Sequence, residues 1–172
     1  MELSLSNIGA GDEAIKNTLL KMKFLILNSD ASDTTRIIKE TAKNIVAQIP
    51  SNDHYLQIKT VIGWVRRNLK YCRDLFGVEE LTSPVRTLYN IKAKVNTHSS
   101  DCDDYAMLIA ALLRALGFRT RLEAIAVQGP RYDHARAAVY INGEWVVIEG
   151  TKNVPVGQAQ ISRLPIMAVE VI

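Results

Sequence analysis

The sequence lacks any long, uninterrupted run of apolar residues. No run reaches the roughly 18 residues that a membrane-spanning helix needs. The start, Met1-Glu2-Leu3-Ser4, has no basic region followed by an apolar one. These absences predict a protein with neither a signal peptide nor a transmembrane segment, and we expect it in the cytoplasm.

Cysteine is also scarce, since Cys72 and Cys102 are the only two. Two cysteines are too few for a disulfide framework, and neither lies in a CxxC pair or a Cys/His cluster with zinc-ligand spacing. This usage is typical of a reducing compartment with reduced thiols. Cys72 has no basic or histidine pattern around it and is interpreted as a packing residue.

An excess of charge of one sign is missing as well. The chain has 21 Lys and Arg against 18 Asp and Glu, a net charge of +3, and these side chains are scattered. We therefore expect neither a nucleic acid nor a membrane as partner. The 172 residues, 48% of them hydrophobic, fit one domain. The expected domain spans 1–172, with a helical part over 12–90 and a catalytic core at about 99–157.

Hydrophobic periodicity divides the chain into a helical half and a strand-rich half. Apolar spacing of three and four, with capping residues, predicts helices over 12–28, 34–48, from about 54 to 71, and 84–89. The stretch 74–82 between them is expected to be connecting chain. Alternation with period two predicts strands over 118–127, 134–141 and 144–150, and an edge strand over 167–172.

The most informative stretch is 100–117. From Ala106 onward it consists of good helix formers, with a single charge after Asp104. A helix that is apolar on nearly every side is buried, so we predict a central buried helix that ends at Gly117. Cys102 then lies in its first turn, where free backbone N–H groups and the positive end of the helix dipole favour a thiolate.

Two interpretations of Cys102 stay open on this pattern alone. Cysteine often behaves as a small buried hydrophobic residue, and the carboxylates of Asp101, Asp103 and Asp104 would raise the pKa of the thiol. A nucleophilic role needs a histidine from elsewhere in the chain. His98 precedes Cys102 by four residues and is interpreted as a loop residue that points away from the helix start.

A hairpin at Asn142-Gly143 permits a geometric prediction. Asn-Gly between two strand-like runs is the strongest short-range hairpin signal, and a two-residue loop sets a register in which Arg136 lies opposite Glu149. His134 then lies on the same face as a diagonal neighbour of Glu149. Their separation of roughly 7 to 8 Å is one that the two side chains can span.

A thiol at a helix start, a strand histidine and a carboxylate on the same face are what nucleophilic catalysis requires. The imidazole takes the proton of the thiol, and the carboxylate fixes the tautomer of the imidazole and stabilises its charged form. We therefore predict Cys102, His134 and Glu149 as catalytic residues. The alternatives are a half-buried histidine satisfied by hydrogen bonds and a cross-strand salt bridge of Glu149 with Arg136.

The sequence resembles the transglutaminase-like branch of the papain-like cysteine enzymes. The likeness lies in the run Ser-Asp-Cys-Asp-Asp-Tyr-Ala at 100–106, in the apolar helix that ends in Leu-Gly, and in His134 with an acid fifteen residues later. The segments 64–71 and 77–84 also resemble the small members encoded by tailed phages and prophages. Roughly, the likeness covers 34–157.

This resemblance implies an α+β fold in which N-terminal helices and a central buried helix pack on a small antiparallel sheet. It implies that Cys102 attacks an amide carbonyl of a protein or peptide substrate, that His134 acts as base and then acid, and that Glu149 orients it. The backbone N–H of Cys102 is a candidate oxyanion donor. Transfer of the thioester to water would make a peptidase or amidase, and transfer to an amine would make a cross-link.

No cofactor is expected, although some bacterial relatives bind calcium through acids beside the cysteine. The corresponding residues here are Asp101, Asp103 and Asp104, which also suit a role as caps and solvated charges.

The sequence departs from the family pattern at three positions. Glu149 stands where aspartate is usual, Ser100 where glycine is common, and Arg136 where an apolar residue is common. A protein from another functional class therefore stays open as an alternative: a phage-type structural or assembly protein, associated with the virion, that retains the fold without the chemistry. A module that grips a peptide without cleaving it is a third possibility.

Overall fold

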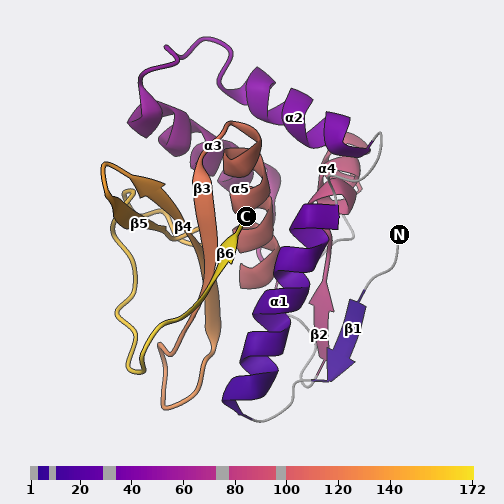
Figure 1. Cartoon of the computed structure of the whole chain (residues 1–172). Coiled ribbons are helices and arrows are strands. Elements are labelled where there is room, and N and C mark those ends of the chain that lie inside the picture. The colour runs from indigo at the N-terminus through magenta and orange to yellow at the C-terminus, as the bar shows by residue number, and fades with distance from the viewer. Residues whose placement is uncertain (1–3, 8–10, 29–33, 73–77, 96–99) are drawn as a thin grey trace.

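The computed structural model describes residues 4–7, 11–28, 34–72, 78–95 and 100–172 (Figure 1). It is an α+β fold, as predicted, with helices packed beside a four-stranded antiparallel sheet. The helices are α1 (Asp12–Asn28), α2 (Thr34–Ile45), α3 (His54–Asn68), α4 (Pro84–Lys92) and α5 (Cys102–Ala115). The strands are β1 (Ser4–Asn7), β2 (Val78–Leu81), β3 (Arg119–Ile125), β4 (His134–Ile141), β5 (Glu144–Ile148) and β6 (Met167–Val171).

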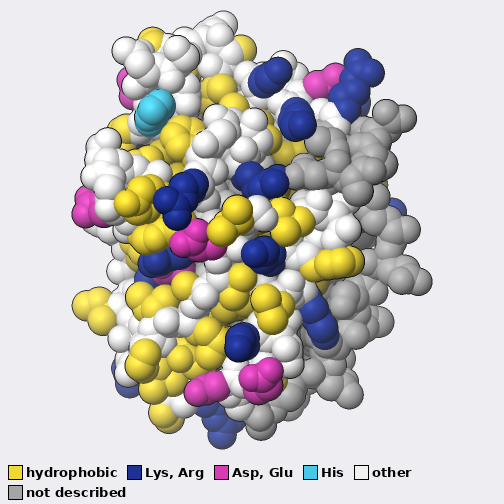
Figure 2. Space-filling view, in the orientation of Figure 1, with side chains coloured by type: hydrophobic (Ala, Val, Ile, Leu, Met, Phe, Trp, Pro, Cys, Tyr) yellow, Lys and Arg dark blue, Asp and Glu magenta, His cyan; other side chains and the backbone are white. Residues whose placement is uncertain are grey.

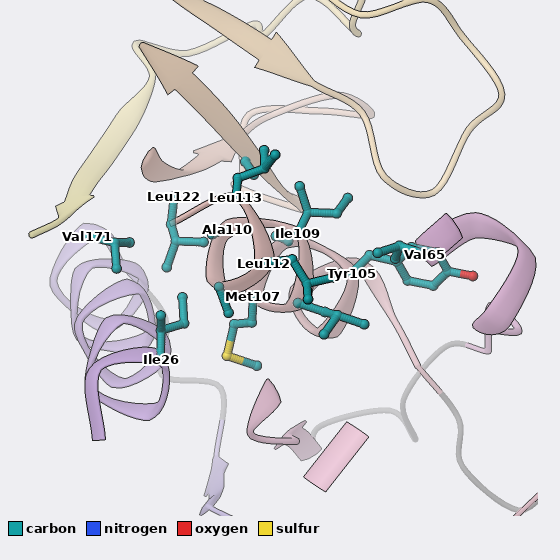
Figure 3. Packing of buried hydrophobic residues seen from close by; sticks show 14 of the residues in the cluster. Ile26, Val65, Tyr105, Met107, Ile109, Ala110, Leu112, Leu113, Leu122 and Val171 are labelled. Carbon is teal, nitrogen blue, oxygen red and sulfur yellow. The ribbon is translucent and has the colours of Figure 1, made fainter. Parts of the chain in front are cut away.

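Helix α5 is the buried central helix that the sequence predicts. The side chain of Asp101 caps it by accepting a hydrogen bond from the backbone N–H of Asp103 at 3.0 Å. Gly117 follows its end with φ of 94°, a left-handed conformation that glycine adopts without strain. Every residue from 103 to 113 is buried. Figure 3 shows side chains of α1, α3, β3 and β6 around it, including Ile26, Val65, Leu122 and Val171.

The four-stranded sheet has the order β5-β4-β3-β6, with each neighbouring pair antiparallel. Asn142 and Gly143 form the predicted tight turn, with φ of 51° and 89°. Ile141 pairs with Glu144, so the predicted hairpin register is confirmed. In β4, Ala135, Ala137 and Val139 belong to the hydrophobic core that includes α5.

Three expectations about the first half of the chain are wrong. Val78–Leu81 was expected to be connecting chain, but it forms β2 and pairs antiparallel with β1. Each of the two strands has only four residues, and paired residues such as Ser4 and Leu81 lie more than seventy positions apart in the sequence. No local sequence pattern therefore indicates this pairing. Cys72 is exposed, so it is not a packing residue. Helix α2 ends at Ile45, three residues before its predicted end.

Charged side chains of both signs are interspersed with hydrophobic ones on the coloured part of the face in Figure 2. Among the described residues, no helix combines the length and the apolar character required to cross a membrane.

Gly150 lets the chain after β5 lie directly against α5. A methyl group added at this position would lie 3.0 Å from Ile109 Cδ1 and 3.1 Å from Tyr105 Cβ. Contacts of this length are tighter than ordinary van der Waals packing, and Tyr105 Cβ is tied to the helix backbone. Because Gly150 has no side chain, the chain can approach α5 closely here, and this fixes the distance between α5 and Glu149, the residue before Gly150.

We expect Gly150→Ala to lower the free energy of unfolding by about 1 to 3 kcal/mol, because the added methyl overpacks the contact with α5. Urea denaturation at neutral pH measures the change. The matched control is Gly129→Ala, since a methyl group at Gly129 has no heavy atom within 4 Å. An equal loss of stability in both variants would contradict the close packing at Gly150.

Candidate active site

Cys102 is the first residue of α5, and its side chain is partly buried against the hydrophobic core. The sulfur takes part in backbone hydrogen bonds at Ala135 and at Cys102 itself. Ala135 is the second residue of β4. The sulfur therefore lies where β4 begins, next to the backbone of the residue that follows His134.

The thiol of Cys102 is held in its neutral form. Burial raises its pKa well above the ordinary value of 9.0, and the negative charges of Asp103 and Asp101 raise it further. The backbone hydrogen bonds act in the opposite direction but do not outweigh these effects. Burial and the carboxylates, which the sequence also predicts to raise this pKa, thus outweigh the groups at the helix start that favour a thiolate. The thiol lies 3.8 Å from Asp103 Oδ1, to which it donates a hydrogen bond.

His134 and Glu149 form the pair that the hairpin register predicts. The Nε2 atom of His134 lies 2.9 Å from each carboxylate oxygen of Glu149. The side chain of Glu149 is 1% exposed and that of His134 is 11% exposed. An ionised carboxylate only accepts hydrogen bonds, so Nε2 carries the proton and, in the neutral ring, Nδ1 is the acceptor.

Several groups keep Glu149 ionised despite its burial. Burial alone would raise the pKa of this carboxyl group, but the hydrogen bond and charge of His134 hold it below the ordinary value of 4.5. Thr151 contributes through its backbone and through its hydroxyl, which donates to Glu149 Oε1 at 3.0 Å. Glu149 thus has two partners that fix its position and its charge.

The structure brings the three predicted residues to one end of β4, but only two of them are hydrogen-bonded to each other. His134 and Glu149 are directly bonded, whereas Cys102 and His134 form no hydrogen bond with each other. Arg136 does not form the alternative salt bridge with Glu149; its Nε donates to Glu123 at 2.7 Å. The other candidate histidine, His98, lies outside the described residues.

The segment before Cys102 is fixed by contacts with the residues that follow α3. Tyr71 and Ser100 form a parallel bridge, and Cys72 N–H donates to the carbonyl of Ser100 at 3.1 Å. One turn into α5, the hydroxyl of Tyr105 donates to the carbonyl of Leu69 at 2.8 Å. Ser100 is buried within this contact.

The three acids beside Cys102 that the resemblance suggests as calcium ligands divide between two sets of contacts. Asp104 is buried and accepts a hydrogen bond from the backbone N–H of Thr82 at 2.9 Å. The ligand atoms of Asp101 and Asp103 instead lie within 4.8 Å of each other and of the Cys102 sulfur. Calcium prefers six to eight oxygen ligands, and sulfur is a poor ligand for it. This donor set does not fit calcium.

Arg66 of α3 supports the site and was not singled out from the sequence. Its guanidinium donates to the carbonyls of Glu149 and Gly150, the latter at 3.3 Å, to the carbonyl of Val154 at 3.2 Å, and to Asn153 Oδ1 at 3.4 Å. These acceptors lie more than eighty residues away in the chain. Because most of them are backbone atoms, no pattern of side chains could have indicated the contact.

A groove of about 650 Å³ lies at the opposite end of α5 from Cys102. Its lining comes from α1, α2, the end of α5 and the edges of β3 and β6, including Ile26, Ala115, Phe118 and Val171. This groove does not include any of the three predicted catalytic residues.

Comparisons with known proteins agree with this architecture. A family model described as a transglutaminase-like domain matches residues 40–158. A provisionally assigned cysteine protease from Cytophaga hutchinsonii aligns with a TM-score of 0.55 and 21% identity over 79% of this chain. A provisionally assigned protease from Parabacteroides distasonis aligns with a TM-score of 0.55 and 11% identity over 81% of this chain.

At such identities the two structures show a shared fold. This chain spans 47% and 26% of their lengths, respectively. A search of curated proteins finds none that matches the sequence.

We expect Arg66→Met to lower the free energy of unfolding by about 1 to 3 kcal/mol, because it leaves backbone carbonyls after β5 without their donor. Thermal or urea denaturation measures the loss. Arg67→Met is the matched control, since Arg67 is the next residue of the same helix and is exposed. If both variants lose the same stability, the contacts of Arg66 do not hold the segment around Glu149.

Glu149 should contribute stability that depends on pH. Its folded pKa is lower than the ordinary value of 4.5, so the stabilisation is fully present above that value and is lost as the pH falls through the folded pKa. The free energy of unfolding of the wild type should therefore exceed that of Glu149→Gln most above about pH 5.5, with a narrowing difference below about pH 4.5. Urea denaturation from pH 3 to 7 tests this, with the exposed Glu144→Gln as control. A difference independent of pH would contradict the assigned charge.

Proposed function

Because the chain belongs to the transglutaminase-like domain family, we propose that it is a cysteine enzyme that acts on amide bonds of a protein or peptide substrate. Cys102 is the nucleophile, His134 is the base and then the acid, and Glu149 orients the imidazole. The observation that carries the proposal is the bond of 2.9 Å between His134 Nε2 and Glu149, in a strand whose next residue, Ala135, contacts the sulfur of Cys102 through its backbone.

The neutral thiol determines the order of the first step. Since the pKa of Cys102 is raised by burial and by Asp103, the resting enzyme holds a thiol rather than a preformed thiolate. His134 Nδ1 accepts the thiol proton as the sulfur attacks the amide carbonyl, and Glu149 stabilises the resulting imidazolium. The attack requires that Sγ and Nδ1 come within hydrogen-bond reach of each other, and substrate binding would supply this movement.

The remaining steps return the site to its starting state. The tetrahedral oxyanion is stabilised by the backbone N–H of Cys102 at the start of α5. The C–N bond then breaks, the amine leaves with the proton from His134, and a thioester forms on Cys102. Water or a second amine attacks the thioester after His134 removes its proton. The product is an acid in the first case and a new amide in the second, and the thiol is regenerated.

A second candidate function is a structural or assembly protein, of the kind found in phage particles, that retains the fold without catalysis. One observation favours it: burial raises the pKa of the Cys102 thiol, whereas reactive cysteines are usually accessible and acidic. The two proposals differ in whether the reactivity of Cys102 depends on His134.

The test measures iodoacetamide alkylation of Cys102 between pH 7 and 10 in a Cys72→Ser background, which leaves one thiol. If His134 assists deprotonation, His134→Ala should slow alkylation at pH 7.5 by about tenfold or more. Asp103→Asn removes a negative charge beside the sulfur and should speed alkylation about threefold to tenfold at pH 8. It therefore serves as a control that the assay reports the environment of the thiol.

Substrate turnover is then measured with casein as the acyl donor. Incorporation of a fluorescent primary amine would indicate transfer, and release of ammonia or new peptide ends without incorporation would indicate hydrolysis; Cys102→Ala should abolish either. Alkylation that is unaffected by His134→Ala, in a protein whose rate still responds to Asp103→Asn, would refute the enzyme and favour the structural protein.

A further inference from the structure

A cluster of buried charges lies on the same sheet face as His134. Glu123 of β3 is completely buried, and Arg136 of β4 is 4% exposed. Glu123 Oε2 accepts from Arg136 Nε at 2.7 Å, and Glu123 Oε1 accepts from Arg121 Nε at 2.8 Å. A buried carboxylate is costly unless it is paired, and none of these three residues has a part in the mechanism above.

Arg136 lies between two carboxylates on neighbouring strands. On one side it pairs in register with Glu123 of β3. On the other side, Ala137 pairs with Ile148, the last residue of β5. One further step of that register places Glu149 opposite Arg136, while His134 is only its diagonal neighbour. An Arg136 released from its partners would therefore compete with His134 for Glu149.

If Arg136 had no other partner, Glu149 would bind Arg136 in preference to His134. A guanidinium is always charged and binds a carboxylate through two parallel hydrogen bonds, whereas an imidazole offers one. The observed hydrogen bonds are the reverse of this expectation. Glu149 binds His134, and Arg136 makes no hydrogen bond with Glu149. Arg136 is held by Glu123 and by the carbonyl of Gln160, to which Nη1 donates at 2.9 Å.

We propose that Glu123 is a positioning residue that engages Arg136 and so reserves Glu149 for His134. This inference rests on the proposed function, in which the His134–Glu149 pair activates Cys102. It accounts for a fully buried glutamate that touches no reacting group. It also accounts for a nearly fully buried arginine in the middle of the sheet.

The inference is tested by NMR of protein labelled with ¹⁵N-histidine, in which His134 Nε2–H gives an exchange-protected resonance shifted downfield by the carboxylate. The other two histidines are distinguished by the variant His134→Gln. Glu123→Gln should abolish this resonance, because the released Arg136 binds Glu149. The double variant Glu123→Gln/Arg136→Met should restore it, since no guanidinium then competes.

Arg121→Met is the matched control. It removes a cation from the same carboxylate without releasing Arg136, so the resonance should persist. Alkylation of Cys102 in the Cys72→Ser background should fall about tenfold in Glu123→Gln and recover in the double variant. If Glu123→Gln does not fold, Glu123→Asp, with and without Arg136→Met, is compared by the same criteria.

A resonance that persists in folded Glu123→Gln, or that stays absent in the folded double variant, would overturn the inference. So would its absence from the wild-type protein between pH 6 and 8. Failure of the proposed function has a different signature, because the resonance needs neither substrate nor a reactive thiol. If His134→Ala leaves the alkylation rate of Cys102 unchanged while the resonance follows the expected pattern, the proposed enzymatic function is refuted. The positioning role of Glu123 is then still supported.

Discussion

The complete burial of α5 is the constraint on which the rest of the structure depends. A helix enclosed by the four other helices and a sheet cannot slide or rotate without opening the core, so its first residue is fixed relative to β4. Small residues permit the close approach at this end: Ala135 and Ala137 face the helix from the sheet, and Gly150 lies against Tyr105. Packing alone therefore brings the sulfur of Cys102 to the start of β4, where His134 lies.

Charge around this fixed point is arranged so that the carboxylate is ionised and the thiol is neutral. His134 and Thr151 lower the pKa of Glu149, whereas burial and two aspartates raise that of Cys102. The same first turn of α5 thus has competing effects, since its dipole favours a thiolate and its acidic side chains oppose one. Of the two aspartates that raise the pKa of the thiol, Asp101 has a structural reason to be there, because it caps the helix. Stability of the helix start is obtained at the expense of thiol acidity.

The sequence predicts those parts of the site that depend on local patterns. The Asn-Gly turn fixes a register, and the register alone places His134 diagonal to Glu149, because side chains alternate strictly along strands. Helix α5 follows from composition and caps. Contacts between distant segments could not be predicted in the same way. The pairing of β1 with β2 involves two short segments, and Arg66 binds backbone carbonyls whose position depends on the whole fold. The reversal of the thiol pKa required knowledge of burial, which the helix pattern indicates for α5 as a whole but not for one atom in its first turn.

The glutamate at position 149 fits the geometry of this hairpin. Strand β5 ends at Ile148, so residue 149 continues past the paired strand, and its target is a diagonal rather than a direct neighbour. Diagonal positions are farther apart than opposed ones, and the additional methylene of glutamate spans part of that difference. The result places both carboxylate oxygens 2.9 Å from His134 Nε2 while one of them still accepts from Thr151. An aspartate on the same backbone would have a shorter reach, and the strand end or the histidine would have to move toward it. The longer side chain of Glu149 thus compensates for the end of β5 at Ile148, and a glutamate at this position forms the hydrogen-bonded pair with His134.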